Sequence, residues 1–184
     1  MRIVLGLDPG LAKVGYGAIR CEGPRYHHVT HGVIRTDASD SPGARLACIH
    51  AGIVRILEQL RPEGAGVESL FLTRNTRSAM QVAEARGVLI LTLAEAGVPY
   101  REYTPSQIKR SILMRGSGDA QKGQVQQMIR LMLGMDEVAS PHDAADALAT
   151  AICFANDVLP GMVLRTAEAP KGADREARAA GAGE

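Results

Sequence analysis

Three strand-like segments separated by short turns open the chain, and they narrow the folds that it can adopt. Residues 2–8 form a short apolar run that ends at Pro9-Gly10, and residues 13–20 and 26–35 have similar strand-forming composition. Short connections join antiparallel neighbours, because a parallel pair needs a crossover of a dozen or more residues. The sheet is therefore predicted to begin with an antiparallel meander.

After the meander, helix and strand patterns alternate. Apolar residues at positions 46, 49, 53, 56 and 60 recur with helical spacing between Ser41-Pro42 and Pro62. The next predicted elements are a strand over 64–72, a helix over 75–97, a strand over 98–103 and three further helices, the first opened by a Thr104–Gln107 capping box and the last beginning at Ser140-Pro141. This order predicts an α/β fold in which a mixed five-stranded sheet has helices on both faces.

The chain of 184 residues is long enough for one domain with a sizeable core. Between Thr166 and Glu184 there is no aliphatic residue larger than Ala and no aromatic one, so this stretch cannot build a core. We therefore predict one domain over residues 1–160 and a disordered tail over residues 161–184.

The N-terminus lacks the apolar region of a signal peptide, and no apolar run reaches about 20 residues. The cysteines at positions 21, 48 and 153 are odd in number and far apart, which favours reduced core thiols. These features predict a cytoplasmic protein without a membrane span.

Four acidic residues stand out, although each has an ordinary structural explanation when it is taken alone. Asp8 ends the first strand and could form a turn before Pro9-Gly10, and Glu68 could be an edge-strand charge. Asp143 and Asp146 lie three residues apart in an otherwise apolar helix; Asp143 completes a capping-box pattern with Ser140, and Asp146 could favour the positive helix end. Taken together, the four acids suit a divalent-cation site, since Mg²⁺ prefers oxygen ligands.

Basic residues are concentrated between Arg101 and Arg130, where six bases (Arg101, Lys109, Arg110, Arg115, Lys122, Arg130) outnumber two acids (Glu102, Asp119). The stretch could face phosphates or could be a solvated helical surface. If Asp119 caps a helix, Lys122 lies in the first turn of that helix, where the helix dipole disfavours a cation. A phosphate partner would explain a lysine at this position, and an exposed lysine that is simply tolerated there is the alternative.

The "HHVTH" run suggests a metal site, but strict strand alternation points His28 away from His27 and His31, which argues against one.

Several blocks of the sequence resemble the RuvC family of Holliday-junction resolvases in order and spacing. They are "GLDPGLAKVGYGAI", "VESLFLTRNTRSAMQVAEARGV", "PSQIKRSILMRGSGDAQKGQVQQMI" and "DAADALATAI", and the resemblance covers most of residues 2–155. It implies a ribonuclease-H-like fold and a homodimeric, Mg²⁺-dependent endonuclease that cuts two symmetric strands of a four-way DNA junction. The expected products are nicked duplexes with 5′-phosphates, Mn²⁺ is expected to substitute for Mg²⁺ in a two-ion site, and RuvA and RuvB are the expected partners.

The resemblance also implies roles for individual residues. Asp8, Glu68, Asp143 and Asp146 match the metal-binding acids, and Lys122 is expected to act with them in catalysis. The residues expected to contact DNA are Phe71, Arg74, Asn75, Lys109, Arg110, Arg115 and Lys122. Phe71 matches an aromatic expected to meet unpaired bases, although core packing would also explain it.

The chain departs from the family pattern in two places. Many relatives have a small hydroxyl residue and then Arg after Asp8-Pro9-Gly10, whereas "LAK" stands here, so that Lys13 is the available cation. Some relatives have His where this chain has Asp143, and the preceding His142 is expected either to support the site or to be exposed.

Three other functions are compatible with parts of the pattern. A nuclease of the same fold that acts on structured RNA would also use the "LDPG" opening and the final acidic helix. An actin-like phosphotransferase shares the strand–turn–strand start, but it needs two lobes and usually a far longer chain. A junction-binding protein without chemistry would not need the complete set of acids.

Overall fold

The computed structural model describes residues 1–69, 76–113 and 122–159. The strands are β1 (Arg2–Asp8), β2 (Lys13–Glu22), β3 (Arg25–Arg35), β4 (Gly64–Glu68) and β5 (Tyr100–Tyr103), and the helices are α1 (Pro42–Leu60), α2 (Thr76–Glu95), α3 (Pro105–Leu113), α4 (Lys122–Leu133) and α5 (His142–Val158). The predicted tail over residues 161–184 lies outside these ranges.

The strands form one five-stranded sheet in the order β3-β2-β1-β4-β5. The pairs β1–β2 and β2–β3 are antiparallel, whereas β1–β4 and β4–β5 are parallel, so the predicted meander and the mixed sheet are confirmed. Because β4 lies between β1 and β5, the interpretation of Glu68 as an edge-strand charge is wrong. The fourth strand ends at Glu68, and residues 70–72 of the predicted strand lie outside the described ranges.

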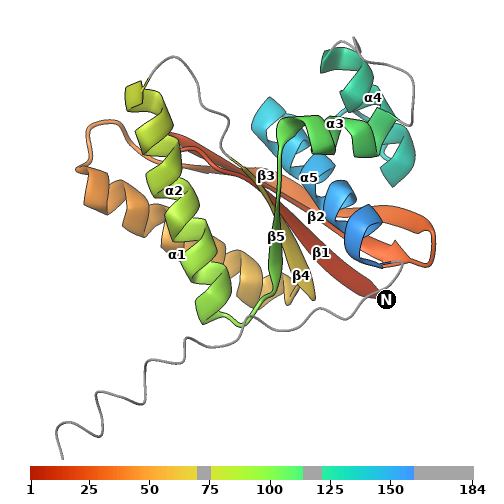
Figure 1. Ribbon diagram of the computed structural model, residues 1–184, viewed down its shortest axis with the longest axis horizontal. Coiled ribbons are helices and arrows are strands. Elements are labelled where there is room, and N and C mark those ends of the chain that lie inside the picture. Colours follow the sequence, from red (N-terminus) through yellow and green to blue (C-terminus); the bar gives the residue numbers. More distant parts are fainter. Residues whose placement is uncertain (70–75, 114–121, 160–184) are drawn as a thin grey trace, which may run out of the picture.

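Helices cover both faces of the sheet, as the sequence predicts. Helices α1 and α2 lie on one face and α3, α4 and α5 on the other (Figure 1). Side-chain alternation along β1 divides the residues between two cores, since Leu5 and Leu7 belong to the core under α1 and α2, and Val4 belongs to the core under α5. Gly6 and Asp8 share the face of Val4.

Glycines in the sheet allow α5 to lie directly on β1 and β2. A Cβ atom on Gly6 would be 1.9 Å from the carbonyl oxygen of Ala147, and one on Gly15 would be 2.0 Å from that of Asp143. Neither position leaves room for a side chain of any size. The absence of a side chain at Gly6 and Gly15 thus sets the distance between the helix and the sheet.

Two helix starts were predicted from capping patterns, and the structure confirms one of them. At α3, the Thr104 hydroxyl accepts from the Gln107 amide at 3.3 Å, while the Gln107 side chain accepts from the Thr104 amide at 2.8 Å. At α5, Pro141 occupies the N-cap position and no side chain caps the helix, so the Ser140–Asp143 capping box is wrong. Ser140 lies one residue too early for its hydroxyl to serve the first turn.

The prediction that His28 points away from His31 is also wrong. Ala18 pairs with Thr30 and Ile19 with His28, which leaves Val29 without a partner in the ladder. This β-bulge breaks the alternation and turns both imidazoles to the same side, with His28 Nε2 and His31 Nδ1 2.7 Å apart.

The cysteines agree with their predicted roles only in part. All three are free, and Cys21 and Cys153 are buried, but Cys48 is exposed on α1 and is therefore not a core thiol. Among the residues described, no helix is long and apolar enough to cross a membrane.

Candidate active site

Asp8 and Glu68 lie side by side at the carboxyl ends of two neighbouring parallel strands. Leu7 of β1 pairs with Val67 of β4, so the next residue on each strand is an acid. Adjacent strands are about 4.8 Å apart, and alternation turns both carboxylates away from the core of Leu7 and Val67, toward α5. Both acids are half-buried.

Asp143 and Asp146 lie on the first turns of α5, at the same end of the sheet as Asp8 and Glu68. The carbonyl of Asp143 lies over Gly15, which is the antiparallel partner of Asp8, so the start of α5 is held beside the end of β1. Asp146 is one helical turn further along, about 5–6 Å from Asp143 between Cβ atoms. All four predicted acids therefore border one end of the sheet, on one face.

Glu68 and Asp146 line a common hollow of about 340 Å³ together with Lys109 of α3 and Gln126 of α4. Pro105, Ile108, Val125 and Ala149 complete its lining. The hollow thus combines two carboxylates and one cation, and four elements of the fold contribute to it. A phosphate placed there would meet both the Lys109 cation and the carboxylates.

Gln126 is a site residue that the sequence does not single out. Its Nε2 lies 2.5 Å from Nδ1 of the exposed His142, so it links α4 to the first residue of α5. A glutamine on an amphipathic helix is an ordinary surface residue in the sequence, and no spacing or motif distinguishes it.

The other predicted DNA contacts are distributed around the hollow or fall outside the description. Arg110 is exposed on α3 and does not line the hollow; its Nε lies 3.5 Å from the Ser106 carbonyl. Lys122 begins α4, but the orientation of its side chain is not described. Phe71, Arg74, Asn75 and Arg115 lie outside the described residues.

The chemistry of the four acids suits a hard divalent cation, since every donor is a carboxylate oxygen. Within the described ranges, however, no three His, Cys, Asp or Glu side chains are grouped so that they could hold a metal ion. Mg²⁺ is usually bound by one or two carboxylates together with substrate phosphate and water. The arrangement therefore fits ions whose coordination the phosphate of a bound nucleic acid completes.

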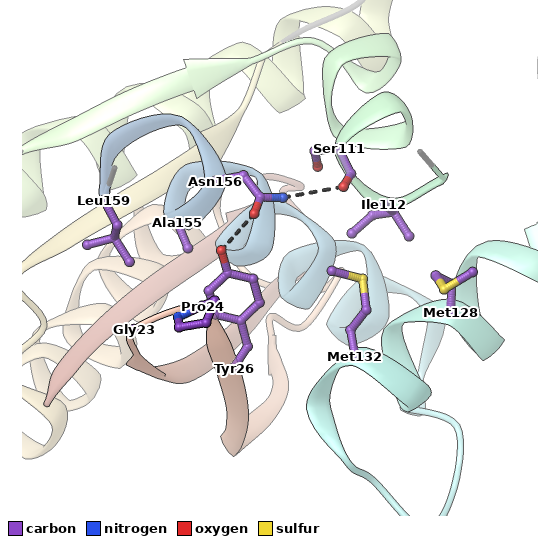
Figure 2. A pocket seen from close by; sticks show the side chains of 10 residues that line it. All are labelled: Gly23, Pro24, Tyr26, Ser111, Ile112, Met128, Met132, Ala155, Asn156 and Leu159. Carbon is purple, nitrogen blue, oxygen red and sulfur yellow. Dashed lines mark hydrogen bonds between the residues drawn. The ribbon is translucent and has the colours of Figure 1, made fainter. Parts of the chain in front are cut away.

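A larger hollow of about 660 Å³ lies elsewhere on the molecule, at the carboxyl end of α5 (Figure 2). Tyr26 donates to Asn156 at 2.7 Å, and Asn156 donates to the Ser111 carbonyl at 3.3 Å along its side (Figure 2). Of the described residues that line it, none is charged. The acidic hollow is therefore the better candidate for an active site.

Comparison with known proteins identifies the family to which this chain belongs. Residues 4–154 match the family described as "Crossover junction endodeoxyribonuclease RuvC". The relative of that name from Heliobacterium modesticaldum is 43% identical over 89% of this chain and 99% of its own, and the one from Geotalea uraniireducens is 45% identical over 87% and 92%.

Solved structures agree with these relatives. The Thermus thermophilus RuvC structure in complex with a Holliday junction substrate has a TM-score of 0.76 and 32% identity, and it covers 83% of this chain and 92% of that one. The yeast mitochondrial Holliday junction resolvase Ydc2 has a TM-score of 0.59 and 13% identity, and the match covers 82% of this chain and 76% of that one. At this identity, the likeness supports the fold alone. From its fold, its identity to these relatives and the extent of the match, this chain belongs to the RuvC family.

Proposed function

We propose that this protein is an endonuclease that resolves Holliday junctions by nicking two symmetric strands, in homologous recombination and DNA repair. The observation that carries the proposal is the placement of Asp8, Glu68, Asp143 and Asp146 around one end of the sheet, beside a hollow that also contains Lys109. Relatives that cover most of the chain are crossover junction endodeoxyribonucleases, and one of them has been solved with a Holliday junction. These relatives do not favour the structured-RNA alternative.

The proposed cofactor is Mg²⁺, for which Mn²⁺ substitutes, with two ions in each active site. When bound, such ions activate a water and stabilise the charge on the leaving oxygen of a phosphodiester. Asp8 is the candidate to contact both ions, because it lies between Glu68 on the neighbouring strand and Asp143 at the start of α5. Asp146 completes the set on the side of the hollow.

The protein's own residues then orient the scissile phosphate. Lys109 lines the hollow beside Glu68 and Asp146, where its charge offsets that of the phosphate, and Lys122 is proposed to act in the same way. Water attacks the phosphorus in line, the bond from phosphorus to the 3′-oxygen breaks, and the phosphate remains on the 5′ end. The result is a nicked duplex whose ends can be ligated.

Two symmetric nicks require two active sites, so we propose that the protein acts as a homodimer. RuvA and RuvB are the proposed partners in branch migration, and the cytoplasm is the proposed compartment. Arg110, together with Phe71, Arg74, Asn75 and Arg115, is proposed to extend the DNA contact beyond the acids.

The proposal is tested with a synthetic mobile four-way junction and a linear duplex of the same sequence, each with Mg²⁺, Mn²⁺ or EDTA. We expect paired nicks on the junction alone, and only with metal. Asp146→Asn and Glu68→Gln should bind the junction but reduce cutting to background, whereas Glu58→Gln, on α1 across the sheet, should cut normally. Cutting by either site variant at the wild-type rate would remove that acid from the active site.

A further inference from the structure

Lys13 and Arg35 form an exposed pair of cations at the end of the sheet that carries the acids. Lys13 is the first residue of β2 and Arg35 the last of β3, and the two are direct partners in the antiparallel ladder. Side chains of directly paired residues project to the same side of the sheet. The two charges are therefore adjacent and face the same way.

Strand alternation places this pair on the face of the acids. Gly15, two residues beyond Lys13, faces the Asp143 carbonyl and pairs with Asp8. Ile34, next to Arg35, packs against Gly52 of α1 on the opposite face. Two residues of a strand span about 7 Å, so the backbone of Lys13 lies about this distance along β2 from Gly15, the residue that adjoins Asp8 and Asp143.

The turn that leads into Lys13 is hydrogen-bonded to Thr36, the residue that follows β3. The Thr36 amide donates to the Ala12 carbonyl at 3.2 Å, and its hydroxyl donates to the Leu11 carbonyl at 2.6 Å. Arg45 of α1 donates to the same hydroxyl at 2.9 Å. These bonds hold the backbones of Lys13 and Arg35 in a defined place.

Like charges placed directly opposite each other on a sheet are destabilising. Within the described part of the chain, neither the Lys13 nor the Arg35 side chain has a hydrogen bond or an ion pair. Other arginines of the sheet have acidic partners, such as Glu22 for Arg20 and Asp157 for Arg101. An unbalanced pair of cations with a fixed backbone is suited to binding an anion.

We propose that Lys13 and Arg35 bind a phosphate of the DNA backbone next to the scissile phosphate, an inference that rests on the proposed function. In the strand order, β2 and β3 lie on one side of Asp8, while β4, with Glu68, lies on the other. Lys109 borders the Glu68 side. A DNA strand that crosses the acids therefore passes between two sets of cations, with Lys13 and Arg35 on the β2 side and Lys109 on the Glu68 side.

The test is the salt dependence of junction binding by the full chain, measured in EDTA so that no cutting occurs. Each lost phosphate contact should reduce the slope of log affinity against log salt by about 0.7–0.9. Because the pair binds one phosphate, the affinity of the double variant Lys13→Ala/Arg35→Ala should fall about threefold less than that of the wild type between 50 and 200 mM salt, and the variant should bind more weakly at low salt. Lys13→Arg/Arg35→Lys should restore the wild-type slope.

The matched control is Arg25→Ala/Arg55→Ala, which removes two exposed cations from the far end of β3 and from α1. It should leave the slope unchanged. An unchanged slope for the Lys13/Arg35 variant, with a wild type that binds and cuts the junction, would overturn this inference and leave the proposed function intact. A wild type that neither binds nor cuts the junction would overturn both.

Discussion

Gly15→Ala tests whether the contact between β2 and α5 sets the geometry of the acids. A Cβ atom at this position would lie 2.0 Å from the carbonyl oxygen of Asp143 and 2.5 Å from its carbonyl carbon. Carbon and oxygen atoms in close contact are ordinarily about 3.3–3.6 Å apart. Both neighbours are backbone atoms, so no side-chain rotation relieves the clash, and the first turn of α5 must move away from the sheet by more than about 1 Å.

This displacement should reduce both stability and activity. Overpacking of this kind costs about 1–3 kcal/mol of unfolding free energy. For a domain of this size, each kcal/mol corresponds to about 2–4 °C in Tm, so we expect Tm to fall by about 2–12 °C. Asp143 and Asp146 move with the helix while Asp8 and Glu68 stay, and a misplacement of 1 Å can cost on the order of 100-fold in rate.

The two effects are measured by thermal unfolding followed by circular dichroism and by single-turnover junction cleavage well below Tm. The control is Gly87→Ala on α2, where an added Cβ meets nothing within 4 Å. That substitution should stabilise the helix by about 0.5–1 kcal/mol and leave cleavage unchanged. If Gly15→Ala unfolds at the wild-type temperature and cuts at the wild-type rate, the helix is not held by this contact.

Two further predictions concern other parts of the fold. Hydrogen bonds from Arg101 and then Tyr103 hold the pKa of Asp157 below its usual range, so the carboxylate stabilises the fold at neutral pH and this contribution is lost as pH falls through the lowered pKa. Asp157→Asn should lower the free energy of unfolding in urea by about 1 kcal/mol or less at pH 7, since the pair is partly exposed. In strong acid the variant and the wild type should have the same free energy of unfolding. An equal difference at both pH values would contradict the assignment. Cys48 is exposed, whereas burial raises the pKa of Cys21 to about 11. A thiol reagent should therefore modify Cys48 alone in the folded protein and all three cysteines in denaturant. Rapid labelling of Cys21 before unfolding would contradict this expectation.

The amino-acid sequence by itself determines the elements of this protein and the positions of its acids along them. Apolar spacing at intervals of three and four residues defines α1, and the Thr104–Gln107 pattern marks the start of α3, because both signals act within one or two helical turns. The same local reasoning places Asp8 at the end of a strand and Asp146 near the start of a helix.

Only the tertiary structure decides which of these positions meet. Asp8 and Asp143 are far apart in the sequence, and they become neighbours because Gly6 and Gly15 allow the backbone of α5 to approach the sheet. The Val29 bulge and the Lys13–Arg35 pairing likewise depend on the register between β2 and β3. Such contacts arise from packing between segments that are distant in the sequence, whereas a local sequence pattern depends only on residues a few positions apart. The acids can therefore be identified in the sequence, but the geometry that brings them together exists only in the folded chain.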